Sequence, residues 1–412
     1  MTVTRADRNV LRTLAHEVAG IADLPVQQET RTLWRALNSL QPVRPMARID
    51  ELPWHEMDVD GELTLQTQDE TDRRFERSLR QTLYAWRHMP LDMVVEPVIE
   101  IPKVIRTSGF GIDIRETTLV TDPHNEIVSH GYIDQLEDAT AAERIRAPVV
   151  DFDAEATAEL EAKAHEVFDG ILEVRMQGWL PSFELWDDIV NWRGAQTVLF
   201  DLADRPEHMH EIASRYTDAR LEMLDQLEEK GLLGRDQALI HCSGAWTDEL
   251  PAPGYDPDRP RVRDLWTFGM AQILGSVSPQ MFGEFEVPYA SRWYARFGLA
   301  YYGCCDPLHE RVHLVRRIPN VRKISMSPWA DVEVGAEAIG SDYVVSYKPD
   351  PALVARESWR PEAIEDDLRH VVEICRRTGS PLEITLKDIS TAAYKPQRLW
   401  EWADIAARVV RG

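Results

Sequence analysis

The hydrophobic pattern of the chain changes near residue 90. In the first part, apolar positions recur at helical spacing over 6–21 and 68–88. The segment 42–54 between these stretches contains Pro and Trp and is typical of a loop. We therefore predict a helical N-terminal extension over residues 1–90, which acts as a cap on the rest of the chain or as a dimerisation surface.

Beyond residue 90, short strand-like runs alternate with longer helical ones. The predicted strands are 171–178, 238–244, 299–305, 321–327, 342–348 and 382–389, after a Val- and Ile-rich run at 93–105. The predicted helices are 186–202, 207–230, 262–274, 279–297, 310–318, 332–339, 361–378 and 396–410. Strands that alternate with helices imply a parallel sheet, and about seven or eight such units suit a (β/α)8 TIM barrel. We assign this barrel to residues 91–412, with a β-hairpin insertion near 109–133 whose turn is 122–125.

An open, doubly wound sheet is the main alternative to the barrel. Such sheets bind dinucleotides through a GxGxxG pattern that directly follows a strand. This pattern follows none of the predicted strands. The fold class that we predict is therefore α/β, a TIM barrel with an N-terminal helical extension.

Composition narrows the functional classes. The formal net charge is −24 over 412 residues, and so acidic a surface repels nucleic acid and anionic membranes. No apolar run approaches the ~18 residues that span a bilayer, and the N-terminus lacks a signal-peptide core. Four cysteines are too few for a disulfide framework. We expect a cytoplasmic protein that acts on a small molecule, with neither nucleic acid nor a membrane as partner.

Two of the predicted strands, 171–178 and 382–389, alternate apolar with polar side chains. In a barrel the apolar faces should meet the surrounding helices, so we expect the polar faces to point into the lumen. The polar side chains are Glu173, Arg175, Gln177, Glu383 and Lys387. Charges in a lumen are costly unless they pair or bind a ligand. An internal ion-pair network is the alternative to a ligand site.

Nitrogen and sulfur ligands stand at two predicted strand ends. His241 and Cys242 end one strand, and the adjacent Cys304 and Cys305 end another. Imidazole and thiolate suit zinc, and a catalytic zinc needs three protein ligands and an open position. We expect His241 with one or both of Cys304 and Cys305 to hold it, with Cys242 and Glu383 as further candidates. Ordinary buried packing is the alternative. Because neighbours in a strand point to opposite faces, Cys304 and Cys305 should not bridge each other.

Further candidates follow these strand ends. Asp306 is either a helix cap or an acid, and His309 is either a general acid/base or a surface residue. Trp179 could wall a flat substrate or pack in the core. The candidate catalytic residues are Glu173, Arg175, Asp306, His309 and Lys387. The candidate substrate-binding residues are Gln177, Trp179, Tyr302 and Lys348.

Three segments carry a resemblance to a known superfamily. The stretch SPQMFGEFEVPY at 278–289 resembles the SPxxFxxFxxPY helix of the uroporphyrinogen decarboxylase superfamily, which includes corrinoid-linked, zinc-dependent methyltransferases. The YGCC at 302–305 lies where those methyltransferases carry H-x-C-G, and SYKPDPAL at 346–353 resembles their GNxDPxxL segment. Tyr302 stands in place of the histidine, and the stretch 383–388 lacks the third ligand, a cysteine. The RQAGR-like run of the true decarboxylases is also absent.

The resemblance implies a TIM barrel, a cytosolic enzyme and a homodimer, with one of two activities. In the first, zinc binds a thiol or other acceptor, and the methyl group comes from a corrinoid on a partner protein. In the second, a metal-independent decarboxylase acts on a small carboxylated aromatic or pyrrole-type substrate. Arg175 and Lys387 would hold its carboxylate, and Asp306 or His309 would protonate the carbon that loses CO₂.

Overall fold

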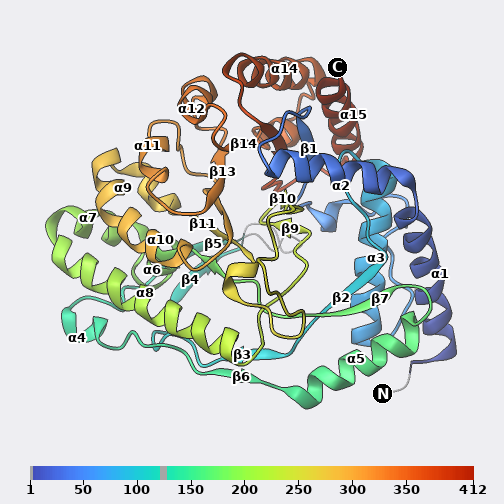
Figure 1. The fold of residues 1–412 in the computed structure, drawn as a ribbon, viewed down its shortest axis with the longest axis horizontal. Helices are drawn as coiled ribbons and strands as arrows, with labels where there is room; N and C mark the ends of the chain where they lie inside the picture. The colour runs from blue at the N-terminus through green and yellow to red at the C-terminus, as the bar shows by residue number, and fades with distance from the viewer. Residues whose placement is uncertain (1–2, 121–127) are drawn as a thin grey trace.

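The computed structural model describes residues 3–120 and 128–412, and a seven-stranded parallel sheet lies at its centre (Figure 1). The strand order is β1-β15-β14-β13-β12-β11-β8. Its strands are β1 (Met46–Ile49), β8 (Ser182–Phe183), β11 (Trp266–Gly269), β12 (Leu299–Tyr302), β13 (Val321–Met326), β14 (Val344–Tyr347) and β15 (Leu382–Leu386). All neighbouring pairs are parallel, so the carboxyl ends of the strands meet at one edge.

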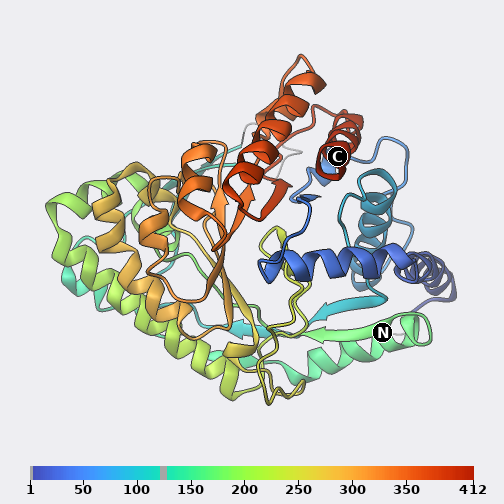
Figure 2. The ribbon, with the colours of Figure 1, turned by 45° about the horizontal axis from the view of Figure 1, so that its top comes forward.

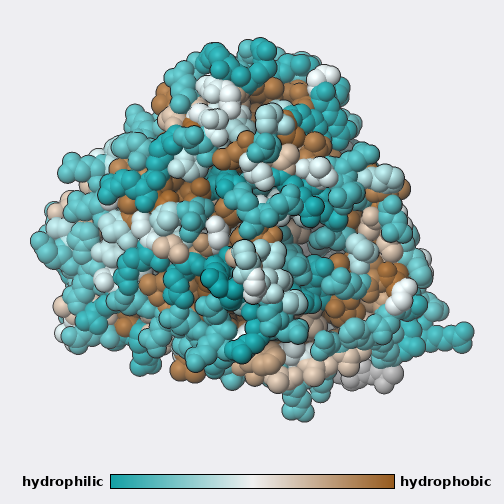
Figure 3. Space-filling view, in the orientation of Figure 1, coloured by the Kyte–Doolittle hydropathy of each residue, from teal (hydrophilic) through white to brown (hydrophobic). Residues whose placement is uncertain are grey.

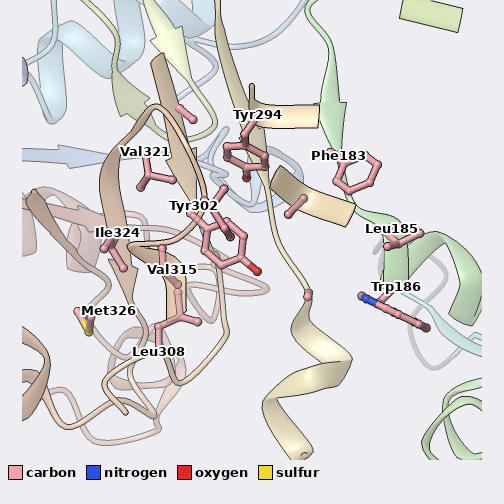
Figure 4. Close-up of a cluster of buried hydrophobic side chains, with 14 of the residues drawn as sticks. Phe183, Leu185, Trp186, Tyr294, Tyr302, Leu308, Val315, Val321, Ile324 and Met326 are labelled. Carbon is pink, nitrogen blue, oxygen red and sulfur yellow. The ribbon is translucent and has the colours of Figure 1, made fainter. Parts of the chain in front are cut away.

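Helices cover the outer face of this sheet. The sheet's helices are α6 (Leu185–Arg193), α7 (Ala195–Asp204), α8 (Pro206–Glu229), α9 (Pro279–Phe285), α10 (Val287–Tyr294), α11 (Val312–Val315), α12 (Val332–Ile339), α13 (Ala352–Ala355), α14 (Pro361–Thr378) and α15 (Gln397–Arg411). The largest hydrophobic core lies between these helices and the sheet, and Figure 4 shows Phe183, Trp186 and Tyr302 among its side chains. The sheet is TIM-barrel-like, but no closed barrel is formed by the described parts of the chain.

A second, smaller layer stands beside the sheet. Strands β2 (Val98–Pro102) and β7 (Glu173–Gln177) pair only with each other, in parallel. They pack with α1 (Arg5–Ala22), α3 (Glu70–His88) and α5 (Ala154–Phe168) around a separate hydrophobic core. Figure 2 shows this layer below and to the right of the central sheet. The strand predicted at 171–178 is therefore present, but it does not belong to the seven-stranded sheet.

Three predicted elements need correction. The segment 42–54, predicted as a loop, contains β1, whose four residues are too few to show an alternating pattern and whose pairing with β15 stabilises it. The predicted helix 262–274 contains β11 between two 3₁₀ helices, Val262–Asp264 and Gln272–Ser276, whose apolar residues mimic a helical period. The predicted strand 238–244 is a small hairpin of β9 (Leu239–Ile240) and β10 (Ser243–Gly244).

The remaining elements lie outside the seven-stranded sheet and the β2–β7 layer, and among them α2 (Pro25–Asn38) carries the fully buried Trp34 and Leu37. They are α2, the 3₁₀ helix Trp54–Glu56, β3 (Ile105–Thr107), β4 (Glu116–Leu119), β5 (Ser129–Tyr132), α4 (Ala139–Ala142) and β6 (Val150–Phe152). Strands β4 and β5 pair antiparallel inside the segment predicted as a hairpin insertion. The turn predicted at 122–125 lies outside the described residues.

Two further observations concern the described helices and one face of the molecule. None of the described helices is both long enough and apolar enough to cross a membrane. The face drawn in Figure 3 is mainly hydrophilic, with small and scattered apolar patches.

Candidate active site

The tip of the β9–β10 hairpin brings His241 and Cys242 to the inner face of the central sheet. Helix α2 holds the hairpin, because Asn38 Nδ2 donates to the carbonyl oxygens of Gly244 (3.0 Å) and Trp246 (2.7 Å). Figure 2 shows the end of α2 beside the hairpin. At the tip, His241 adopts a left-handed backbone conformation (φ 50°), and its ring stacks on Phe268 of β11 with centroids 4.1 Å apart.

A group of five residues, which we call the thiol cluster, forms around the Lys387 ammonium: Cys304, Cys305, His241, Lys387 and Asp388. Lys387 Nζ lies 2.9 Å from Cys304 Sγ, 3.0 Å from His241 Nε2 and 3.2 Å from Asp388 Oδ2. Cys305 Sγ lies 3.6 Å from Cys304 Sγ and donates to Asp388 Oδ2 at 3.3 Å. These residues follow the carboxyl ends of β12 and β15, where parallel-barrel enzymes place their active sites.

The two adjacent thiols lie on the same side of the chain, although strand alternation predicts opposite sides. The strand ends at Tyr302, and Gly303 then takes φ 90°, a conformation that favours glycine. A Cβ at Gly303 would lie 2.4 Å from Leu308 Cδ1. The backbone therefore turns before Cys304, and both sulfurs reach one place. Their 3.6 Å separation exceeds the ~2.05 Å of a disulfide, so both thiols are free.

The pKa of Cys304 is lowered to about 4. The main cause is the contact with the Cys305 thiol, whose single proton lies between Cys304 Sγ and Asp388 Oδ2. Burial acts in the opposite direction, but His241 and the Lys387 charge add to the lowering. The hydrogen bond to Cys304 raises the pKa of Cys305 in turn. The pair therefore carries one proton at neutral pH, on Cys305, and Cys304 is a thiolate.

The contact between His241 and Lys387 limits how many protons the cluster holds. Burial lowers the pKa of His241, but the charge of Cys242 and the hydrogen bonds to Cys242 and Cys304 together outweigh it, and the pKa rises to about 9. The pKa of Lys387 also rises, because Cys242 and Cys304 outweigh its burial. A hydrogen bond at 3.0 Å nevertheless needs an acceptor, so Nε2 of His241 and Nζ of Lys387 cannot both bring a proton to it.

Cys242, another predicted metal ligand, contacts a different lysine. Lys348 Nζ donates to Cys242 Sγ at 3.0 Å and to Ser346 Oγ at 3.1 Å. Burial raises the pKa of Cys242, but Lys348 and His241 lower it below its ordinary value. Cys242 thus belongs to a separate pair beside the cluster.

Glu383 is also separate from the cysteines. Its Oε2 accepts from Lys323 Nζ at 2.8 Å and from Ser243 Oγ at 2.7 Å, and both charged side chains are fully buried. Burial raises the pKa of Glu383, but the Lys323 and Lys348 charges hold it below the ordinary value. This interior ion pair is the alternative that the sequence left open for the lumen charges.

The polar face of β7 belongs to the two-stranded sheet, not to the sheet whose strand ends carry the thiol cluster. Arg175 Nε lies 3.1 Å from Glu173 Oε1 and 3.7 Å from Asp236 Oδ2, and its Nη1 lies 3.4 Å from Glu100 Oε1. Gln177 donates to Glu100 and to the carbonyl oxygen of Arg235. These residues form a network on the two-stranded sheet, and no described contact joins it to Lys387.

The remaining predicted residues are spread over the core and the strand ends. Tyr302 points into the core, where its hydroxyl donates to Glu286 Oε1 at 3.0 Å (Figure 4). Asp306 accepts from the backbone nitrogens of Cys304 (3.0 Å) and Ala271 (3.3 Å), so it anchors the cysteine loop, and burial raises its pKa to about 6. Trp179 packs against the main core.

His309 is half-buried behind the cysteine loop. Its Cβ lies beside Gly335 of α12, and its Nδ1 finds no partner among the described residues. It forms no described contact with the thiol cluster.

Sequence reasoning missed two carboxylates at the cluster. Asp388 directly follows Lys387 in the predicted strand, so its position after the strand end was the available signal. Glu51 Oε2 lies 3.4 Å from Lys387 Nζ and accepts from the backbone nitrogen of Asp388. Glu51 follows β1. Because the sequence analysis predicts this segment as a loop, it does not place Glu51 at a strand end.

The donor set of the thiol cluster suits a metal ion. One ligand atom each from Cys304, Cys305 and Asp388 lies within 4.8 Å of the others. Two thiol sulfurs and a carboxylate oxygen are ligands that zinc accepts. The Lys387 ammonium supplies the positive charge between Cys304, His241 and Asp388 in this arrangement. A metal ion would therefore take over a role that the lysine performs here.

Comparisons with known proteins identify the fold but no family. No protein-family model matches the chain, and no curated protein matches it. Among solved structures, the chain is similar to a methyltransferase from Methanosarcina mazei, with a TM-score of 0.50 and 11% sequence identity. The match covers 93% of this chain and 99% of that one. The fold is thus shared over nearly the whole length, and the resemblance to the uroporphyrinogen decarboxylase superfamily stays a prediction.

Proposed function

We propose that this chain is a methyl-transfer enzyme whose thiol cluster holds zinc and activates a thiol acceptor. The donor would be a methylated corrinoid on a partner protein, and the active form a homodimer. The observation that carries the proposal is the convergence of Cys304, Cys305 and Asp388 around Lys387, at the carboxyl ends of two parallel strands. The shared fold with a methyltransferase supports it at the level of architecture.

In this proposal, Cys304, Cys305 and Asp388 would hold the metal and leave one position open for the acceptor thiol, while His241 stays the partner of Lys387. Zinc would supply Lewis acidity that lowers the pKa of an acceptor thiol. The protonation states and contacts of the thiol cluster already suit the binding of a cation. Cys304 is already a thiolate, and the Cys305 thiol would lose its proton when a cation enters, because the metal binds the thiolate. Lys387 then keeps two carboxylate partners, Glu51 at 3.4 Å and Asp388 at 3.2 Å.

The decarboxylase alternative finds no comparable support. It requires Arg175 and Lys387 to hold one carboxylate, but Arg175 pairs with Glu173 and Glu100 on the other sheet. Of its two candidate acids, Asp306 has oxygens that accept backbone hydrogen bonds, and His309 forms no described contact with the thiol cluster. We therefore prefer methyl transfer.

Metal content and turnover together test the proposal. Purified full-length protein should contain about one zinc per chain and should demethylate free methylcobalamin in the presence of small thiols. Cys304→Ser should lose both the metal and the activity. Cys375→Ser is the matched control, because Cys375 is buried in α14 and burial raises its pKa to about 12. Wild-type protein without zinc, or Cys304→Ser with unchanged turnover, would refute the proposal.

A further inference from the structure

The adjacent thiols Cys304 and Cys305 lie close enough to react with each other. Their sulfurs are 3.6 Å apart. Strand alternation would place them on opposite faces, but the strand ends at Tyr302 and the backbone turns at Gly303. The reason for which the sequence analysis excludes a bridge between the two cysteines therefore does not hold in this structure.

The two thiols differ in what holds them. The backbone of Cys304 is fixed on both sides, because its nitrogen donates to Asp306 Oδ2 at 3.0 Å and its carbonyl oxygen accepts from Ser325 Oγ at 2.7 Å. Cys304 is also buried. Cys305 is half-buried, and its described hydrogen bonds are those of its thiol, with Cys304 and Asp388. Cys305 is therefore the thiol that can move toward a fixed partner.

The groups around the pair suit oxidation of the sulfurs. Lys387 Nζ lies 2.9 Å from Cys304 Sγ, and a cation at this distance stabilises the thiolate, which is the reactive form of a cysteine. Asp388 Oδ2 lies 3.3 Å from Cys305 Sγ and accepts the hydrogen bond of that thiol. The Asp388 side chain is 46% exposed, so the thiol cluster opens to solvent on this side. A thiolate beside a second, protonated thiol is the arrangement found in redox-active cysteine pairs.

We propose that Cys304 and Cys305 form a reversible disulfide, with a small hydroperoxide as the oxidant. The Cys304 thiolate attacks one oxygen of the hydroperoxide and becomes a sulfenic acid, while the O–O bond breaks and the other oxygen leaves as water or an alcohol with a proton from solvent. The Cys305 sulfur then attacks the Cys304 sulfur. The S–S bond forms, the S–O bond breaks, and the hydroxyl group leaves with the Cys305 proton as water. The two sulfurs lose two electrons, and the hydroperoxide gains them.

The spacing of the two residues makes this disulfide easy to reduce. Neighbouring Cα atoms are ~3.8 Å apart across a trans peptide, closer than the ~4.4–6.8 Å of ordinary disulfides. A strained disulfide is reduced by thiols more readily than a structural one, so excess thiol restores the pair. The bridge also removes two of the three metal donors of the thiol cluster. That consequence rests on the proposed zinc site, whereas the bridge itself does not.

One equivalent of hydrogen peroxide, added to metal-free full-length protein, tests the bridge. After denaturation and alkylation, mass spectrometry should find two alkylated cysteines in place of four, with the mass of two hydrogen atoms lost at Cys304 and Cys305. Dithiothreitol should restore all four. Cys305→Ser should form no disulfide, and its Cys304 should instead be labelled by dimedone, which traps sulfenic acids. Cys375→Ser is the matched control, because Cys375 is a buried free thiol in α14 and its loss should leave the bridge intact.

Three results would overturn the proposal. They are four alkylated cysteines after peroxide treatment, a disulfide that joins Cys304 or Cys305 to Cys242, and oxidation of Cys304 in wild-type protein that dithiothreitol does not reverse. The assay needs neither zinc nor turnover, so failure of the bridge and failure of the methyl-transfer proposal are distinguishable. Circular dichroism of each variant shows that it is folded.

Discussion

Two clusters of ionisable side chains, predicted to share one lumen, differ in almost every physical respect. Lys323 and Glu383 are fully buried on the inner face of the seven-stranded sheet, and in the thiol cluster Lys387 and Cys304 are buried whereas the Asp388 side chain is 46% exposed. The Arg175 network lies on the two-stranded sheet, and Glu173 is 54% exposed. In the first region, neighbouring charges shift the pKa values of buried groups such as Cys304 and Glu383. In the second, the Arg175 guanidinium is buried, but water screens the exposed Glu173 carboxylate that it contacts.

The comparison shows that the partner strand determines whether the polar face of a strand is exposed or buried. Alternation in β7 and β15 is equally clear, and both present polar side chains on one face. Pairing of β7 with β2 places its face beside solvent, whereas pairing of β15 with β14 and β1 places its face in the interior. The same pattern thus yields a surface network in one case and a reactive site in the other.

The largest expected effect is on stability in the buried region. Lys323→Met removes the ion-pair partner of Glu383 and leaves the buried carboxylate with only the Ser243 hydroxyl and the charge of Lys348 to stabilise it. We expect the free energy of unfolding to fall by about 3–5 kcal/mol. Urea denaturation followed by circular dichroism measures it. The double variant Lys323→Met with Glu383→Leu should recover part of the loss, and no recovery would contradict the buried-pair interpretation.

Removal of the central ammonium should change the chemistry of the thiol cluster. In Lys387→Met the pKa of Cys304 should rise by about 1–3 units, because an adjacent positive charge is lost. Thiolate ultraviolet absorbance as a function of pH reports it. Lys395→Met, which changes an exposed lysine in the loop before α15, serves as the control and should titrate like wild type. An unchanged midpoint in Lys387→Met would show that the lysine does not stabilise the thiolate.

The turn that brings the two thiols together should be sensitive to a single methyl group. Gly303→Ala requires a positive φ and a contact of 2.4 Å with Leu308 Cδ1. We expect destabilisation of roughly 1–3 kcal/mol and slower alkylation of Cys304. Gly20→Ala, where a Cβ meets nothing within 4 Å, is the comparison. Equal melting temperatures for the two variants would argue against the strained turn.

The smallest effect is expected in the exposed network. Glu173→Gln removes one of three carboxylates around Arg175, and we expect a loss of no more than about 1 kcal/mol, reduced further by salt. The same denaturation assay applies. A loss as large as that of Lys323→Met would remove the distinction between the two regions.

The sequence predicts the regular elements of the sheet better than the irregular ones. Helices 332–339 and 361–378 are predicted with the bounds observed for α12 and α14, because Asp331 caps the first and Gly379 ends the second. Strands β12 to β15 are also found. β1, β8 and β11 are missed, since short buried strands lack a period of their own and are defined by partners far away in sequence.

Only part of the candidate site could be predicted, again because some of its contacts join residues that are far apart in sequence. Cys304, His241 and Lys387 converge as expected from their positions at segment ends. The partners of Cys242 and Glu383 could not be predicted, because Lys348 and Lys323 reach them across strands in a register that no local pattern shows. Glu51 depends on the position of β1.

The central claim is that Cys304 is a thiolate at neutral pH. The rate of Cys304 alkylation by iodoacetamide, followed by mass spectrometry across pH, tests it most directly. With a pKa of about 4, the rate should be independent of pH from neutral down to about pH 5 and fall only below it. A rate that rises tenfold per unit up to about pH 8.5, as for an ordinary thiol, would contradict the account.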